Sequence, residues 1–148
     1  MRLKKHTDYA LRVLMFLSAK GNDPTTIKEI AQTFEVSQNH LMKVVQQLGQ
    51  LGYVHTLRGK NGGLWLGKPA DQIKIGKVLR DTGEANELAE CFVNKDSCRI
   101  TPVCQLKHVF DEANQAFFKV LDGYSLADIL EQPGRLQAML GLERQALA

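Results

Sequence analysis

Residues Thr26–Leu66 read TIKEIAQTFEVSQNHLMKVVQQLGQLGYVHTLRGKNGGLWL, and this stretch decides the fold. Apolar residues recur every three or four positions in residues 27–34, and again from Ser37 to about residue 51. This spacing predicts two amphipathic helices. Thr25 or Thr26 is placed to cap the first helix and Ser37 to cap the second. Two short helices joined by a tight turn form the helix-turn-helix pattern.

The second predicted helix has an unusual outward face. It is rich in amides and nearly free of acidic side chains, and it comprises Gln38, Asn39, His40, Lys43, Gln46 and Gln47. Amide and lysine side chains hydrogen-bond to base edges and phosphates in the major groove of DNA. We therefore expect this face to contact DNA, although an ordinary solvated helix surface is the alternative. The main contact set that we expect is Gln38, Asn39, His40 and Lys43.

A β-hairpin with a basic tip is predicted after the second helix. Residues 53–57 and 64–66 alternate like strands, and the glycine-rich turn between them carries Arg58 and Lys60. In a winged helix such a hairpin lies along the DNA backbone, where an arginine can enter the minor groove. A phosphate-binding nucleotide loop is the rival interpretation, but no Gly-Lys-Ser/Thr motif opens a following helix. The pattern therefore favours a DNA-binding wing.

The net charge of +3 hides an asymmetry between the two halves of the chain. Residues 1–80 contain 13 Lys and Arg against 5 Asp and Glu, a balance of +8. Residues 81–148 contain 6 against 11, a balance of −5. A basic half favours binding to a polyanion. We predict a DNA-binding domain in residues 1–82 and a second part with another task in residues 83–148.

Composition argues against several classes of protein. There is no run of about 18 apolar residues, so no membrane span is expected. Asp8 and Arg12 interrupt the apolar patch near the N-terminus, which predicts a helix over residues 7–20 rather than a signal peptide. The chain is therefore expected in the cytoplasm. No nucleophile–base pair or substrate-binding motif appears, so no enzymatic activity is expected.

A long amphipathic helix is predicted from residue 101 or 102 to about Asp122. Its apolar stripe consists of Val103, Leu106, Val109, Phe110, Ala113, Phe117, Val120 and Leu121. Beyond it we expect only a small helix capped by Ser125 and a weak tail from Pro133. Because this is too little chain to cover the stripe, we expect a second copy to cover it, as a homodimer. Helix-turn-helix dimers read paired, palindromic half-sites in double-stranded DNA.

The predicted fold class is mainly α with a small β-hairpin. It consists of a winged helix-turn-helix domain followed by a long C-terminal dimerisation helix.

All three cysteines, Cys91, Cys98 and Cys104, lie in one segment whose polar residues predict a loop over most of its length. Three buried hydrophobes, a redox pair with one spare thiol, a zinc site and an iron–sulfur cluster are the alternatives. Six and five residues separate the cysteines, which is wider than structural zinc sites favour. The spacing therefore favours a cluster over zinc, without fixing the fourth ligand or the number of irons.

Several segments of the chain match one family. They are TDYALR (7–12), VSQNHL (36–41), NHLMKV (39–44), RGKNGG (58–63), LGKPA (66–70), CRITPVCQLK (98–107) and YSLAD (124–128). Together they resemble the bacterial winged-helix iron–sulfur regulators, the family that includes NsrR and IscR, over most of the chain. Within it they are most similar to the NsrR branch of nitric-oxide-sensing repressors.

The resemblance implies a 4Fe–4S cluster, in preference to 2Fe–2S, held by Cys91, Cys98 and Cys104 and by Asp8 of the other subunit. Another branch uses a histidine three residues after the last cysteine; here that position is Lys107, and His108 falls one residue later. Asp8 is therefore favoured over His108.

The implied function is a DNA-binding repressor that leaves its operator when nitric oxide nitrosylates the cluster. The alternative is a regulator of the same family that responds to iron–sulfur supply or redox state. An electron carrier and a zinc-stabilised DNA-binding module are the more distant rivals.

Overall fold

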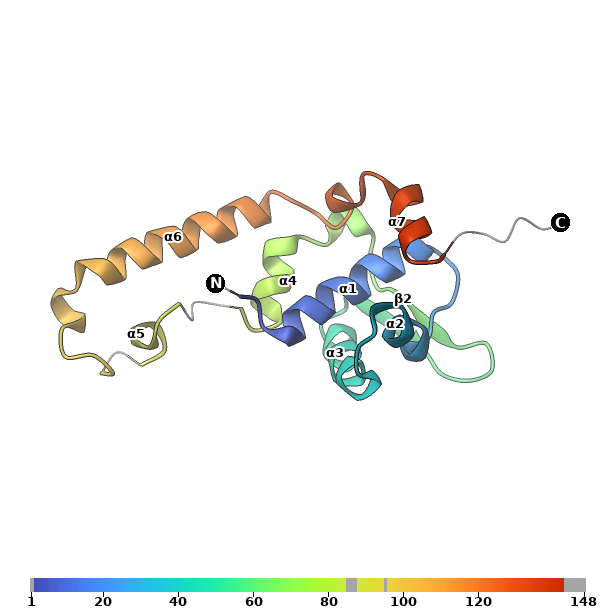
Figure 1. Ribbon diagram of the computed structural model, residues 1–148, viewed down its shortest axis with the longest axis horizontal. Coiled ribbons are helices and arrows are strands. Elements are labelled where there is room, and N and C mark those ends of the chain that lie inside the picture. The colour runs from blue at the N-terminus through green and yellow to red at the C-terminus, as the bar shows by residue number, and fades with distance from the viewer. Residues whose placement is uncertain (1, 85–87, 95, 143–148) are drawn as a thin grey trace.

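The computed structural model describes residues 2–84, 88–94 and 96–142, which form helices and one small sheet (Figure 1). The elements are α1 (Lys5–Lys20), α2 (Ile27–Phe34), α3 (Gln38–Gln50), β1 (Val54–Leu57), β2 (Gly63–Leu66), η1 (Ala70–Gln72), α4 (Ile75–Asp81), α5 (Glu90–Val93), η2 (Thr101–Val103), α6 (Gln105–Asp122), η3 (Asp128–Leu130) and α7 (Pro133–Met139). The η elements are 3-10 helices. Within these residues no helix is long and apolar enough to cross a membrane.

The helix-turn-helix is built as its capping residues predict. The Thr26 hydroxyl oxygen accepts a hydrogen bond from the Glu29 backbone N–H at 3.1 Å, which begins α2. The Ser37 hydroxyl oxygen accepts from the His40 N–H at 3.3 Å, which begins α3. Between them Glu35 adopts the left-handed conformation (φ 53°) that ends α2. The two helices and their tight turn are therefore confirmed.

The main core lies between α1, α3 and the hairpin. Its fully buried members include Ala10, Val13, Leu14, Phe16, Leu17, Ile30, Leu41, Val44 and Leu48. The antiparallel strands pair Val54 with Leu66 and Leu57 with Gly63. The hairpin is tied to the chain before α2 because the Leu64 N–H donates to the Thr25 carbonyl at 2.8 Å. The predicted mainly α fold with a small β-hairpin is thus confirmed.

The long helix α6 is joined to the body near its C-terminal end. Phe118 is buried, and the Arg80 guanidinium of α4 lies 4.4 Å from the centre of its ring. Arg80 also donates two hydrogen bonds, of 2.7 and 2.8 Å, to the Asp122 carboxylate. The N-terminal half of α6 extends away from the body, with α5 beside it (Figure 1).

Four local predictions differ from the structure. Helix α6 begins at Gln105, not at residue 101 or 102, because Thr101–Val103 form the separate 3-10 helix η2. Helix α1 begins at Lys5, not at Thr7; Thr7 is buried and accepts a hydrogen bond from the Thr82 hydroxyl at 3.1 Å. The apolar spacing of Ile73, Ile75, Val78 and Leu79 predicts a linking helix over residues 72–82, but α4 is shorter and begins only at Ile75. Cys91 lies on the short helix α5 rather than in a loop.

The chain after α6 returns to the body, which the sequence did not predict. Residues from Pro133 form helix α7 instead of a weak tail, and the Gln137 side chain donates to the Ala19 carbonyl of α1 at 2.7 Å. Before it, the Ser125 hydroxyl and the Asp128 carboxylate share a 2.7 Å hydrogen bond, and only residues 128–130 of the small helix form. This segment covers α1, not the exposed part of α6.

Candidate nucleic-acid interface and metal ligands

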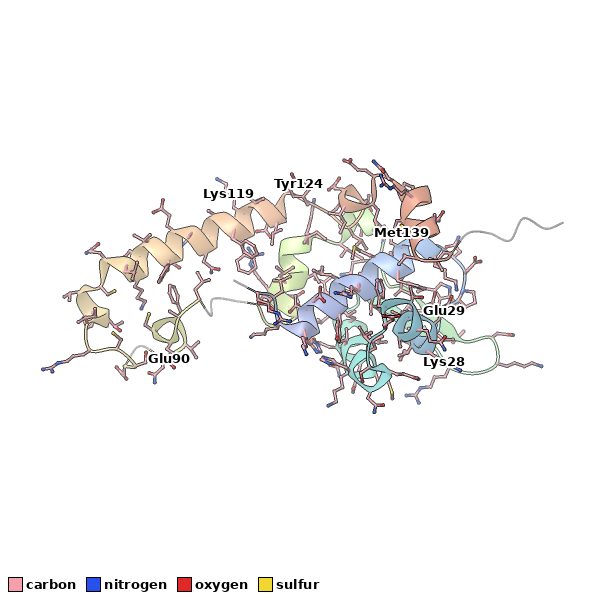
Figure 2. All side chains as sticks on the ribbon, in the orientation of Figure 1. Lys28, Glu29, Glu90, Lys119, Tyr124 and Met139 are labelled. Atoms are coloured by element: carbon pink, nitrogen blue, oxygen red, sulfur yellow. The ribbon has the colours of Figure 1, made fainter. Side chains whose placement is uncertain are left out.

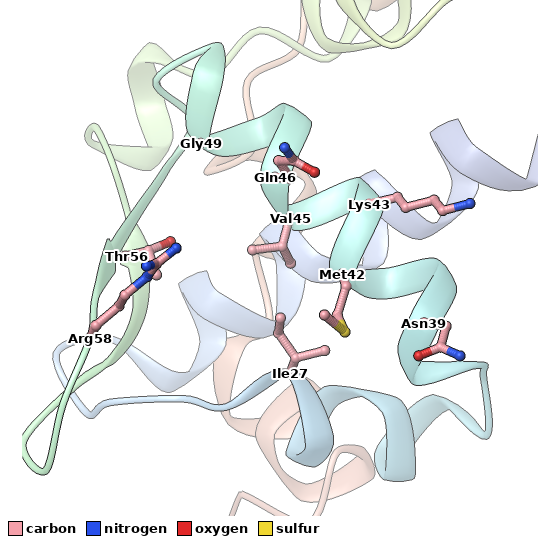
Figure 3. A pocket seen from close by; sticks show the side chains of 9 residues that line it. All are labelled: Ile27, Asn39, Met42, Lys43, Val45, Gln46, Gly49, Thr56 and Arg58. Atoms are coloured by element: carbon pink, nitrogen blue, oxygen red, sulfur yellow. The ribbon is translucent and has the colours of Figure 1, made fainter.

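An open groove runs between α3 and strand β1 (Figure 3). It is lined by Ile27, Asn39, Met42, Lys43, Val45, Gln46, Gly49, Thr56 and Arg58. Lys43 and Arg58 stand on opposite sides of it, one on α3 and one at the end of the hairpin. Amides between two cations are suited to base edges flanked by phosphates.

The six predicted DNA-contact residues fall into two groups. Asn39, Lys43 and Arg58 line the groove, while Gln38 and Lys60 are exposed outside it. His40 is half-buried and turned toward α1, where its ring meets Tyr9 edge-on with centroids 4.8 Å apart. The structure therefore brings together part of the predicted set and places His40 at the joint between α1 and α3.

Five of the groove residues were not predicted as contacts, and of those that carry a side chain two, Met42 and Thr56, are exposed. Met42 is 52% exposed although it is apolar, and Thr56 is an exposed residue of β1. The signal for Met42 was its position, three residues after Asn39 and four before Gln46, which places all three on one side of the helix.

The hairpin tip depends on a glycine that no other residue can replace without movement. A Cβ at Gly62 would lie 2.2 Å from the Leu57 carbonyl oxygen. The Gly62 N–H donates to the Gly59 carbonyl at 2.9 Å, and Gly59 has a φ of 106°. These glycines make the tight turn that holds Arg58 and Lys60 on the exposed side of the wing.

A polar network behind α3 fixes its orientation. The Gln47 amide donates to the Asp81 carbonyl at 3.3 Å and hydrogen-bonds to the His6 ring. The Tyr53 hydroxyl donates to the Asp81 carboxylate at 2.7 Å. Burial, and then the hydrogen bond and charge of Asp81, raise the pKa of Tyr53 well above its usual value. Helix α3, the second helix of the helix-turn-helix and therefore the candidate recognition helix, is thereby tied to both α1 and α4.

The three cysteines are free thiols outside the groove. Cys91 on α5 and Cys104, directly before α6, are half-buried, and Cys98 is exposed. Helix α5 is held near α6 by Lys107, whose ammonium nitrogen lies 6.0 Å from the centre of the Phe92 ring. Among the described residues, no three His, Cys, Asp or Glu side chains lie together as a metal site.

Asp8 lies in the first turn of α1, as predicted, and forms an ion pair with Arg12. The Arg12 Nη2 atom is 2.9 Å from the Asp8 Oδ2 atom, and the guanidinium lies 5.6 Å from the centre of the Phe34 ring of α2. His108 is exposed on α6. Neither residue forms a metal site with the cysteines of its own chain in the described residues.

Comparison with known proteins identifies the family. Residues 3–132 match the Rrf2 family model, described as an iron-dependent transcriptional regulator. The chain is 47% identical over 142 residues to the HTH-type transcriptional regulator NsrR of Bacillus licheniformis, covering 95% of this chain and 99% of that protein. It is also 47% identical over 145 residues to the protein of the same name from Bacillus subtilis (strain 168), covering 97% and 99%.

Solved structures show the same fold. CymR, the global cysteine regulator of B. subtilis, matches with a TM-score of 0.69 at 27% identity, over 87% of this chain and 95% of that chain. T. potens IscR matches with a TM-score of 0.73 at 22% identity, over 93% and 91%. The groove, the wing and these matches agree, and the chain belongs to the Rrf2 family of iron-dependent transcriptional regulators.

Proposed function

We propose that the chain is a repressor whose two-fold dimer binds a palindromic operator and releases it when nitric oxide reacts with an iron–sulfur cluster. The ligands are Cys91, Cys98 and Cys104 of one subunit and Asp8 of the partner subunit, and 4Fe–4S is favoured over 2Fe–2S. The observation that carries this proposal is a segment with three free thiols, outside the DNA-facing groove, in a member of an iron-dependent regulator family.

The charges of the two halves of the chain and the position of the groove suggest a different role for each half. Residues 1–82 contact DNA, through Gln38, Asn39, His40 and Lys43 of the helix and Arg58 and Lys60 of the wing. Residues 83–148 hold the three cysteine ligands and the dimer contact, although α7 packs on α1 in space. Since the groove residues project from the rigid α3 and from β1, a small rotation between subunits changes the spacing of the two recognition helices.

The exposed stripe on α6 supports the dimer. On α6, Leu106 and Val109 are each 57% exposed, Phe110 is 38% exposed and Val120 is 61% exposed. Val103, on η2 just before the helix, is 76% exposed. Apolar side chains gathered in one row on an extended helix mark a contact surface. The same stripe of a second copy covers it most simply, because a two-fold axis places like surfaces against each other.

The cysteine segment fits an iron–sulfur cluster by its donor chemistry, although the thiols are not gathered within one chain. Thiolates are the usual protein ligands of such clusters. The hydrogen bonds around Cys98 are short-range turns, from the Ser97 N–H to Asn94 and from the Thr101 N–H to Cys98. The segment can therefore rearrange without breaking the core. When bound, the cluster supplies irons that react with nitric oxide.

Asp8 connects the proposed ligand set to the DNA-binding helices. Arg12, which forms the ion pair with the Asp8 carboxylate, lies over the Phe34 ring of α2. Tyr9, the residue after Asp8, packs against the His40 ring of α3. A carboxylate engaged across the dimer is drawn from its ion pair with Arg12. The packing of α1 against α2 and α3 then depends on which partner Asp8 has.

The first experiment uses anaerobically purified protein. Its visible absorption spectrum and its affinity for the operator are both measured before and after nitric oxide is added. Loss of the cluster bands together with loss of DNA binding supports the proposal. Cluster bands and DNA binding that nitric oxide leaves unchanged identify the alternative, a regulator of iron–sulfur supply or redox state. A protein that stays colourless after anaerobic reconstitution with iron and sulfide refutes both.

The cross-subunit ligand is tested with mixed dimers of the Asp8→Ala and Cys98→Ala variants. If Asp8 serves the partner subunit, one of the two sites in this dimer regains every native ligand, and half of the wild-type cluster content survives with wild-type stability. If Asp8 serves its own subunit, each site carries one defect and neither is native. The two homodimeric variants are the controls.

A further inference from the structure

Met42 is a large apolar side chain left in the open on the recognition helix. It is 52% exposed, whereas its apolar neighbours Leu41 and Val44 are 1% and 0% exposed. It takes no part in the hydrophobic core of the described residues. Packing of the fold therefore gives no reason for an apolar side chain at this position.

The surroundings of Met42 form a small apolar patch inside a polar groove. Figure 3 shows its side chain directed toward Ile27, with Val45 beside them on the groove wall. Asn39 precedes Met42 by three residues and Gln46 follows it by four, so amides flank it along the helix. A base edge that enters the groove beside α3 meets an amide and then a methyl-bearing thioether.

This combination matches an A·T pair. In the major groove the thymine 5-methyl group is the apolar feature of the base edges, and Asn and Gln pair with adenine N6 and N7. Arginine and lysine are the usual partners of guanine; α3 has no arginine, and its one lysine, Lys43, stands at the side of the groove away from Ile27. We propose that Met42 is a specificity-determining residue that contacts a thymine methyl group in each operator half-site, while Asn39 or Gln46 reads an adenine next to it. The inference rests on operator binding through α3, as proposed above.

The test removes the methyl group from the DNA and the thioether from the protein. Binding sites are selected from a random duplex library with wild-type protein, and each thymine of a half-site is then replaced by deoxyuridine, which lacks only the methyl group. When the contacted thymine is replaced in both half-sites, wild-type affinity should fall about fifteenfold, because each buried methyl group is worth about fourfold and two are lost. Met42→Ala should bind the thymine operator more weakly by a similar factor and lose nothing further on deoxyuridine. Met42→Leu should keep the dependence.

Met139→Ala is the matched control, because Met139 is 81% exposed on α7, on the other side of the body from α3 (Figure 2). It should bind both operators as wild type does, and thermal unfolding should show that all three methionine variants are folded. If the losses from deoxyuridine and from Met42→Ala simply add, Met42 contacts no methyl group and the assignment is wrong. If wild-type protein selects no sequence at all, operator recognition through α3 fails with it.

Discussion

Replacing Gly76 with alanine should destabilise the protein, although the same change in most helices is stabilising. Gly76 lies in α4, where α6 crosses it at Asp122. A Cβ at this position would lie 2.2 Å from the Asp122 Oδ1 atom and 2.9 Å from its Cγ atom. It would also lie 3.0 Å from the Asp122 backbone nitrogen, which no side-chain rotation relieves.

The size of the effect follows from two opposing terms. Alanine gains at most about 1 kcal/mol over glycine here, because that is the value for a helix interior and Gly76 is the second residue of α4. Forcing a methyl group into a packed contact costs about 1–3 kcal/mol, and a backbone contact places the cost at the upper end. The net loss should be about 1–2 kcal/mol. The displaced Asp122 carboxylate also loses its paired hydrogen bonds from Arg80.

Urea unfolding at one fixed protein concentration measures this loss. The control is Gly134→Ala in α7, where a Cβ meets nothing within 4 Å, so stability should stay the same or rise. Operator binding adds a second readout: Gly76→Ala should weaken binding to a full palindrome more than binding to an isolated half-site. A Gly76→Ala protein as stable as wild type would show that α4 and α6 do not pack this closely.

Four further predictions concern caps, pH, assembly and salt. Ser37→Ala should lower stability by about 1 kcal/mol, because α3 loses its N-terminal hydrogen bond; thermal unfolding measures it. The folded protein keeps the Tyr53 proton at pH values where the unfolded chain loses it, so stability should fall as pH rises above about 10. Urea midpoints of wild type and Tyr53→Phe should be compared at pH 8 and 10.5, and the variant should lose less stability between these pH values. An equal loss in both proteins would contradict the hydrogen bond from Tyr53 to Asp81. Val109→Glu should convert dimer to monomer in sedimentation equilibrium, and a persistent dimer would move the interface away from α6. Arg58→Ala should reduce the slope of log affinity against log salt by about 2 for the dimer, because each subunit loses one phosphate contact, whereas an unchanged slope would remove the wing from the phosphate contacts.

The parts of the fold that were predicted are those fixed by neighbours in the sequence. Thr26 and Ser37 cap helices whose apolar spacing was already clear, and each cap needs only a backbone N–H three residues later. Helix α7 was missed because Pro133 and Gly134 resemble the start of a loose tail. Its Gln137 hydrogen-bonds to Ala19, more than a hundred residues earlier, and no local pattern reveals such a contact.

The candidate site follows the same rule. Polarity predicted the outward face of α3, but it did not predict that His40 would turn toward Tyr9. Met42 belonged neither to the predicted buried stripe nor to the predicted polar face, and it was overlooked because an apolar side chain gives no polar signal of a DNA contact. The cysteine segment was found because all three cysteines of the chain lie in it. That Cys91 lies on the short helix α5 and not in a loop became visible only in the structure.

The contact, or joint, between α4 and α6 relates a small rotation at one end of α6 to a large displacement at its other end. Helix α6 has 18 residues, so its length is about 27 Å at 1.5 Å per residue. It is held near Phe118 and Asp122, and Cys104 lies at its other end. A tilt of about 10° at the joint therefore moves the cysteine end by about 5 Å over that length. Conversely, a displacement of about 5 Å at Cys104 corresponds to a tilt of only about 10° at the joint, so a large movement of the cysteine end becomes a small rotation at the body.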